Sequence, residues 1–166
     1  MVTSMDAYDP DRWTDLLVAS AGASAALTGL VFVAVSINLE RILALASLPD
    51  RAFETLMLLL GVVIVSIFGL IPGQGATALG VELIAFTLLM LAAIVALLVR
   101  DAPLPPEARR AVRFAVVAAG TLPFLVAGVS LIAGAGGGLV WVAAGIVGAI
   151  AGGVMNAWVL LVEIQR

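Results

Sequence analysis

Side chains that could do chemistry are few in this sequence, and the first apolar stretch holds the largest group of them. Ser20, Ser24, Thr28 and Asn38 fall within about 80° of one another when the stretch is drawn as an α-helix. Such a polar stripe could line a water-filled or ion-conducting path. It could equally form a helix interface in which each hydroxyl bonds a carbonyl of its own helix. The sequence leaves both interpretations open.

Glu82 is a second candidate, because it lies inside a later apolar stretch. A carboxylate held within a membrane is costly and often functional, so Glu82 could be an ion or proton site near the outer face. The structural alternative is an ion pair with Arg12, which the predicted topology places on the same side. Glu40, Glu54 and Glu163 fall near arginines on the other side. We interpret them as solvated or paired surface charge, or as an inner ring if the protein oligomerises.

The last apolar stretch places Gly145, Gly148, Gly152 and Asn156 on one helix face. Gly148 and Gly152 form a GxxxG pair, which lets two helix backbones approach closely. The partner could be a helix of the same chain or of a neighbouring copy. Because an amide at membrane depth needs a hydrogen-bond partner, and Asn38 is expected at a similar depth, we predict a contact between Asn38 and Asn156.

Pro123 stands in the middle of the fourth apolar stretch. It has no N–H to donate to the carbonyl of Ala119, so it should bend the helix. The bend could act as a hinge for transport. It could also be one of the prolines that membrane helices ordinarily tolerate.

Cysteine and histidine are both absent from the chain. Their absence excludes disulfides, thiolate nucleophiles, histidine bases and the usual zinc and haem ligands. No paired carboxylates are embedded in the apolar stretches. We therefore expect no enzymatic activity, no catalytic residues, no metal site and no cofactor. A nucleic-acid partner is not expected either, because no basic stretch with interleaved aromatics exists.

The elements that must position these residues are membrane helices. Hydrophobic residues make up 63% of the chain, charged residues 11%, and the mean hydropathy is +1.23, far from the balance of a soluble protein. With about 20 apolar residues per span, 166 residues suffice for about five spans and no separate soluble domain. We predict a single all-α membrane domain with helices at residues 13–39, 48–71, 76–99, 106–133 and 139–164.

The arginines predict the orientation of these helices. All eight basic residues are arginine, and short cytoplasmic loops retain positive charge. With five spans, Arg12 alone falls on one face. The other face carries Arg41, Arg51, Arg100, Arg109, Arg110, Arg113 and Arg166. The N-terminus should therefore lie outside and the C-terminus in the cytoplasm.

A weak internal repeat relates the second and third helices to the fourth and fifth. Residues 70–75, LIPGQG, match residues 131–136, LIAGAG, and both turns fall on the outer side. Parallel repeats of helix pairs occur in transporters. Glycine-rich turns also arise by chance in a composition this biased.

The stretch from Gly22 to Leu39, GASAALTGLVFVAVSINL, resembles the first helix of a group of small uncharacterised bacterial membrane proteins, in which an arginine follows the SINL-type ending. The resemblance covers only part of the chain. It implies a multi-pass protein of the bacterial inner membrane. It brings no activity, ligand or catalytic residue with it.

Two functions are compatible with these patterns. The first is a small channel or transporter that works as a homo-oligomer, with a polar path along the first helix. The second is a structural or accessory subunit that packs against a larger membrane protein through its small-residue faces. Both place the chain in the lipid bilayer and expose little of it to water.

Overall fold

The computed structural model describes residues 6–45, 48–100 and 107–164. Within these ranges the chain folds into helices. In chain order they are η1 (Asp6–Tyr8), η2 (Pro10–Trp13), α1 (Thr14–Ile37), α2 (Leu39–Ala44), α3 (Leu48–Gly69), α4 (Ala76–Arg100), α5 (Glu107–Ala133) and α6 (Leu139–Ile164). Helices α1, α3, α4, α5 and α6 are long and apolar enough to cross a membrane. The fold is therefore compatible with a multi-pass membrane protein.

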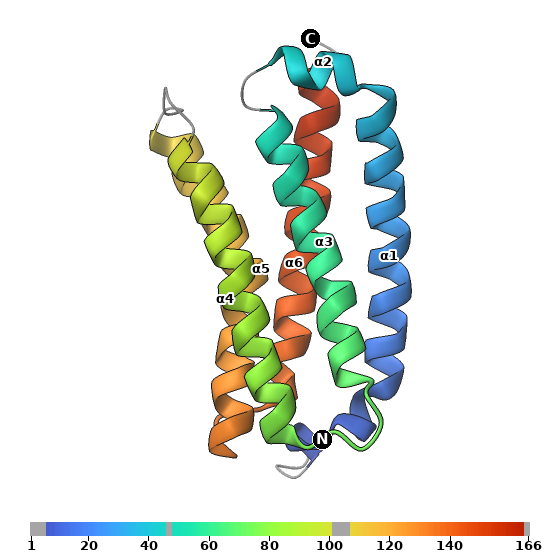
Figure 1. Cartoon of the computed structure of the whole chain (residues 1–166), viewed down its shortest axis with the longest axis vertical. Coiled ribbons are helices and arrows are strands. Elements are labelled where there is room, and N and C mark those ends of the chain that lie inside the picture. The colour runs from blue at the N-terminus through green and yellow to red at the C-terminus, as the bar shows by residue number, and fades with distance from the viewer. Residues whose placement is uncertain (1–5, 46–47, 101–106, 165–166) are drawn as a thin grey trace.

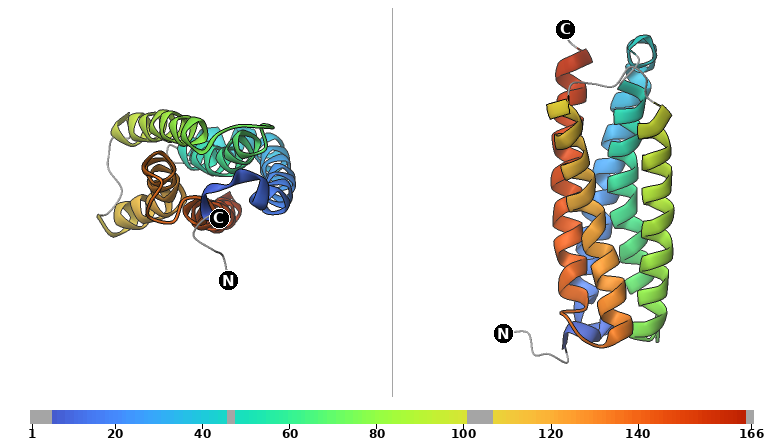
Figure 2. Two further views of the ribbon diagram at one scale, coloured as in Figure 1. Left: turned by 90° about the horizontal axis from the view of Figure 1, so that it is seen from below. Right: turned by 90° about the vertical axis from the view of Figure 1, so that its left-hand side faces the viewer.

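The five long helices run side by side as one bundle (Figure 1). Seen end-on, α4, α3 and α1 form one row and α5 and α6 form a second (Figure 2). The short 3-10 helices and the C-terminal end of α6 lie at opposite ends of the bundle (Figure 1). We call the end with α2, the start of α3 and the end of α6 the arginine end, because Arg41 and Arg51 belong to it. The opposite end is the N-terminal end.

The arginine end gathers the residues expected on the cytoplasmic face. Arg41 is in α2, Arg51 is in the first turn of α3, and Arg113 is in the first two turns of α5. Arg12 lies in η2 at the opposite end. Of the remaining arginines, Arg166 is outside the described residues, and the other three belong to the arginine-end portions of α4 and α5.

Helix α1 lies at the edge of the bundle, where it packs mainly against α3 (Figure 2). Only 17% of the most apolar stretch of α1 is buried, against 56% of the corresponding stretch of α3. Nothing lies within 4 Å of a Cβ built on Gly22 or Gly29. The face of α1 that carries Gly22 and Gly29 therefore has no helix packed against it among the described residues.

The first predicted helix, residues 13–39, extends two residues beyond the end of α1. Helix α1 stops at Ile37, because the backbone of Asn38 leaves helical geometry at φ −106° and ψ 18°. A new helix, α2, starts at Leu39 and lies across the arginine end (Figure 1). Its Ile42 is buried against Leu48, which anchors α2 to the start of α3. The other long helices begin and end within two residues of the predicted bounds.

The two turns of the predicted repeat share one backbone feature. Gly73 and Gly134 occupy matching positions in the two segments, and both adopt positive φ angles, 71° and 63°. Glycine adopts this conformation without the steric cost that other residues pay. Common ancestry of the two helix pairs stays a prediction.

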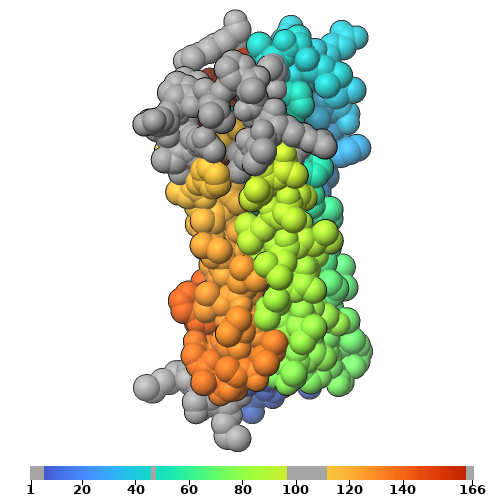
Figure 3. Space-filling view, turned by 60° about the vertical axis from the view of Figure 1, so that its left-hand side comes forward, coloured from blue at the N-terminus to red at the C-terminus, as the bar shows by residue number. Residues whose placement is uncertain are grey.

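Glycines also allow α4 and α5 to pack closely along one face of the bundle (Figure 3). A Cβ on Gly80 would lie 2.7 Å from the carbonyl oxygen of Gly128, and a Cβ on Gly128 would lie 2.7 Å from that of Gly80. In a membrane, where lipid is as apolar as leucine, such close backbone contact is what holds helices together.

The N-terminal end is closed by backbone and side-chain hydrogen bonds. The N–H of Gly137 donates to the Tyr8 hydroxyl over 2.9 Å, and the N–H of Gly138 donates to Ser130 Oγ over 2.8 Å. Gly138 has a φ of 51°, and a Cβ there would overlap the carbonyl oxygen of Ala7. The 3-10 segment is thereby seated on the turn between α5 and α6.

Candidate functional site

A buried ion pair joins α3 to α5 at the arginine end. Arg113 Nε donates to Glu54 Oε2 over 3.0 Å, and Arg113 Nη2 donates to Glu54 Oε1 over 2.6 Å. The side chain of Arg113 is 6% exposed and that of Glu54 is 0% exposed. A bidentate arginine–carboxylate pair is among the strongest hydrogen-bonded contacts in proteins. Ionisable residues within apolar helices are costly, so they commonly mark a functional site.

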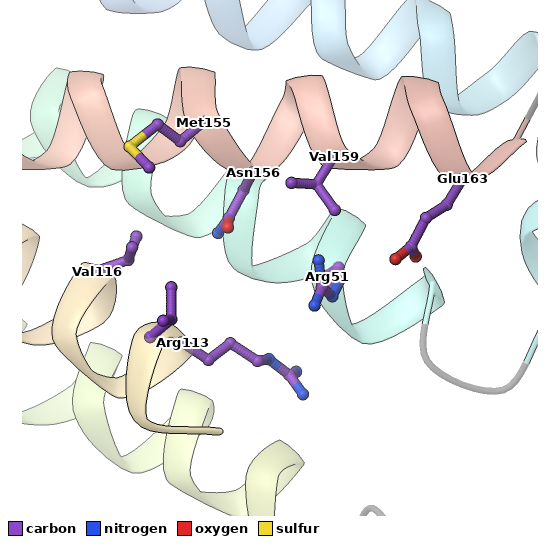
Figure 4. Close-up of a pocket in the computed structure, with 8 residues that line it drawn as sticks. Arg51, Arg113, Val116, Met155, Asn156, Val159 and Glu163 are labelled. Carbon is purple, nitrogen blue, oxygen red and sulfur yellow. The ribbon is translucent and has the colours of Figure 1, made fainter. Parts of the chain in front are cut away.

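The pair lies beside an open pocket lined by α3, α5 and α6, with a volume of about 410 Å³. We call it the arginine-end pocket. Arg51 and Arg113 face it together with one carboxylate, one amide and an apolar wall (Figure 4). Its lining residues are Arg51, Val112, Arg113, Val116, Met155, Asn156, Val159 and Glu163. The pocket thus combines hydrogen-bond donors with an apolar surface.

Asn156 contributes an unused hydrogen-bond donor to this pocket. The residue is 8% exposed, and its Nδ2 has no hydrogen-bond partner among the described residues. Its side chain points from α6 into the space shared with Arg113 and Val116 (Figure 4). A buried polar group without a partner costs stability and calls for an explanation, such as a bound ligand, ion or water. Ser66 Oγ and Gln74 Oε1, outside this pocket, are the other two such atoms among the described residues.

The local sequence explains how the pocket is shaped. Arg51 and Glu54 are three residues apart on α3 and therefore lie on the same side of that helix. The hydroxyl of Thr55 donates to the Arg51 carbonyl over 2.8 Å within the same helix. On the α6 side, a Cβ on Gly152 would lie 2.7 Å from the Val116 side chain. This close approach holds α6 against α5 just beyond the pocket.

The sequence predicts solvated or paired surface charge for Glu54 and Glu163. Glu54 is paired, but the expectation that it lies at the surface is wrong. Its carboxylate is completely buried and paired with Arg113. The sequence does not reveal this pair, because Glu54 and Arg113 are 59 residues apart in the chain. One feature of the sequence nevertheless points to the pair. Glu54 lies three residues after Arg51, and Arg113 lies three residues after Arg110, each in a helix that starts at the arginine end.

The polar stripe of α1 faces α3. Ser20 and Ser24 are buried, and Ser24 Oγ donates to the carbonyl of Leu59 in α3 over 2.7 Å. Thr28 Oγ1 donates to the Ser24 carbonyl over 2.7 Å. Thr28 thus bonds its own helix, as the structural alternative for this stripe expects, whereas Ser24 bonds the neighbouring helix α3.

The predicted contact between Asn38 and Asn156 is wrong as a hydrogen bond. Asn38 Nδ2 donates to the carbonyl of Ala34 in its own helix over 2.9 Å, and Asn156 Nδ2 has no partner among the described residues. The two side chains have different surroundings. Asn38 bonds the end of α1, whereas Asn156 lines the arginine-end pocket between α3, α5 and α6.

The predicted ion pair between Arg12 and Glu82 is also wrong. Arg12 Nε lies 3.6 Å from Asp6 Oδ1 and 3.9 Å from Asp9 Oδ2. Glu82 accepts a hydrogen bond from Gln74 Nε2 over 2.6 Å. Each charge has found a partner close to it in sequence. The role of Glu82 as an ion or proton site stays a prediction.

The glycine face of α6 packs against α5 of the same chain. A Cβ on Gly145 would lie 2.6 Å from the ring of Phe124, and a Cβ on Gly148 would overlap the carbonyl oxygen of Ala119. Gly152 meets Val116, as described above. The GxxxG pair is therefore used inside the bundle.

Pro123 lies inside α5, which continues from Glu107 to Ala133. Pro123 has no N–H, so it cannot donate a hydrogen bond to the carbonyl of Ala119. That carbonyl faces Gly148 of α6. Thr121 Oγ1 donates to the Val117 carbonyl over 2.7 Å and adds a bond within the helix near the proline. The hinge role of Pro123 stays a prediction.

Within the described ranges, no three histidine, cysteine, aspartate or glutamate side chains gather into a group that could hold a metal ion. Comparison of the chain with protein-family models, with curated proteins and with solved structures finds no match.

Proposed function

We propose that the chain is a multi-pass protein of the bacterial inner membrane that binds a substrate in the arginine-end pocket and transports it, working as a homo-oligomer. The observation that carries the proposal is the buried pair of Glu54 and Arg113 beside a pocket of about 410 Å³. Transporters place such charges and unused polar groups where the substrate binds.

The distribution of arginines supports placing the arginine end in the cytoplasm. Arg41, Arg51 and Arg113 belong to this end, and Arg12 lies at the other. Retention of positive charge on the cytoplasmic side is the rule for short loops. In this orientation, the substrate reaches the pocket from the cytoplasm or from the inner leaflet.

The pocket is a better candidate for the substrate site than the α1 stripe. Ser24 and Thr28 already use their hydroxyl donors on carbonyl groups. Asn156, in contrast, presents an unused donor to the pocket. Replacing Thr28 and Asn38 by leucine should therefore leave transport by reconstituted protein unchanged, whereas a path along α1 requires that it fall.

The proposal can be tested without knowing the substrate, because a transporter must open and close the mouth of its site. The chain has no cysteine, so spin labels can be attached to Val112→Cys in α5 and Met155→Cys in α6, both exposed residues that line the pocket. Distances between the labels would be measured by double electron–electron resonance in lipid nanodiscs. We expect two populations or a broad distribution.

The control pair is Val129→Cys in α5 and Val140→Cys in α6, which are exposed at the closed N-terminal end. This pair should give one narrow distance. A single narrow distance at both ends would contradict transport through the arginine-end pocket.

The second candidate, an accessory subunit, is favoured by α1. Its small-residue face is open at Gly22 and Gly29 and could receive a helix of another membrane protein. Native mass spectrometry in a mild detergent separates the two functions. A closed oligomer of this chain supports transport, and a one-to-one complex with a larger protein supports the accessory role.

A further inference from the structure

Two unused hydrogen-bond donors, Arg51 and Asn156, line the arginine-end pocket. Asn156 is more than nine-tenths buried and its Nδ2 has no partner among the described residues. Arg51 makes no ion pair with another described residue, and its guanidinium faces the same pocket (Figure 4). Such donors select a ligand that is rich in acceptors, such as a phosphate or carboxylate.

The charges around the pocket set a limit on the ligand. Glu54 neutralises Arg113 through two hydrogen bonds, which leaves Arg51 as the cation that a ligand can meet. Glu163 lines the same pocket from the end of α6 and repels an anion. A singly charged phosphate diester therefore fits this balance better than a highly charged phosphate ester.

The remaining wall of the pocket is apolar. Val112 and Val116 of α5 and Met155 and Val159 of α6 line it, and Val112 and Met155 are exposed on the outside of the chain. A ligand that fills this site needs an apolar part next to its charged group. Anionic lipids have this structure, and basic pockets between membrane helices commonly bind their headgroups.

We propose that the arginine-end pocket binds the phosphodiester headgroup of an anionic phospholipid, with Arg51 and Asn156 as donors and the valine and methionine side chains against the upper part of an acyl chain. The inference rests on the proposed function, because it identifies the substrate class of the same pocket. It makes the lipid, rather than a small ion, the molecule that the protein binds and moves.

The test is native mass spectrometry of the full chain in a mild detergent, titrated separately with phosphatidylglycerol, phosphatidylcholine and inorganic phosphate. We expect phosphatidylglycerol to bind in preference to phosphatidylcholine. Arg51→Gln and Asn156→Leu should each weaken it by about tenfold, the change expected for one lost hydrogen bond to a charged group. Arg41→Gln, which removes an exposed arginine outside the pocket at the same end, should not.

A variant that binds more tightly is also needed, because the losses in the other variants could result from misfolding. Glu163→Gln removes the repelling carboxylate and should strengthen phosphatidylglycerol binding several-fold. Equal binding of phosphatidylglycerol by wild type, Arg51→Gln and Glu163→Gln would overturn the proposal. If inorganic phosphate binds as tightly as phosphatidylglycerol, the pocket recognises free phosphate, and the assignment of a lipid is overturned.

The two proposals fail separately. If phosphatidylglycerol binds in the pocket but the labelled pair at the mouth shows one fixed distance, the lipid site stands and transport fails. If the mouth moves but phosphatidylglycerol binds no better than phosphatidylcholine, transport stands and the lipid assignment fails.

Discussion

The two ends of the bundle use polar residues in opposite ways. At the N-terminal end, Tyr8, Ser130 and the glycines of the α5–α6 turn bond one another and close the bundle. At the arginine end, Glu54 and Arg113 bond across two helices and leave a pocket beside them. The N-terminal end is closed by hydrogen bonds between its polar groups, with one unused acceptor at Gln74 Oε1, whereas the arginine end has a pocket with an unused donor at Asn156.

The two ends illustrate two roles of polar residues, one in stability and one in ligand binding. Groups that satisfy one another, such as Tyr8 and Gly137, mainly hold elements in place. A group that is buried and left unsatisfied, such as Asn156, lowers stability, and we propose that a ligand completes it. The comparison therefore predicts losses of stability at the closed end and at the ion pair, but not at Asn156.

The largest loss is expected when one partner of the ion pair is removed. Glu54→Ala or Arg113→Ala leaves a buried charge uncompensated and should destabilise the protein by about 3–5 kcal/mol. Thermal unfolding in detergent, followed by circular dichroism, measures the change. Arg41→Ala, at an exposed position of α2, is the matched control and should change little. Equal unfolding temperatures for Glu54→Ala and Arg41→Ala would show that the pair contributes nothing.

A smaller loss is expected at the contact between α5 and α6. The side chain of Gly148→Val would collide with the Ala119 carbonyl and should cost about 1–3 kcal/mol. Gly29→Val, on the open face of α1, provides the control and should be tolerated. If both substitutions are tolerated in an unfolding assay, α5 and α6 do not pack as described.

A still smaller loss is expected at the closed end. Tyr8→Phe removes the acceptor of the Gly137 N–H and should cost about 0.5–1.5 kcal/mol. Hydrogen exchange at residues 134–138 should rise in this variant while exchange in α3 stays the same. Unchanged exchange in the turn would mean that the 3-10 segment does not seal this end.

The smallest effect on stability is expected at Asn156. Asn156→Leu removes an unsatisfied amide from a site with an apolar wall, so unfolding should be unchanged or shifted to a slightly higher temperature. Ligand binding should fall in the same variant. A marked loss of stability would show that Asn156 is a structural residue.

The sequence predicts the helices well, because hydropathy and the prolines and glycines that end a helix act locally. It does not predict which helices meet. Asn38 was expected to reach Asn156, but it bonds Ala34 four residues away. Glu54 and Arg113 looked like separate surface charges, and only the packing of α3 near α5 brings them together. The position of α1 at the edge likewise depends on contacts that its own residues do not specify.

We propose that function resides in the arginine-end pocket and not along α1. The most direct measurement is the transbilayer movement of fluorescent phosphatidylglycerol in proteoliposomes, followed by dithionite quenching, for wild type, Arg51→Gln and Thr28→Leu. The account predicts that wild type and Thr28→Leu accelerate the movement equally and that Arg51→Gln is several-fold slower. No acceleration by wild type, or a loss in Thr28→Leu with full activity in Arg51→Gln, would contradict it.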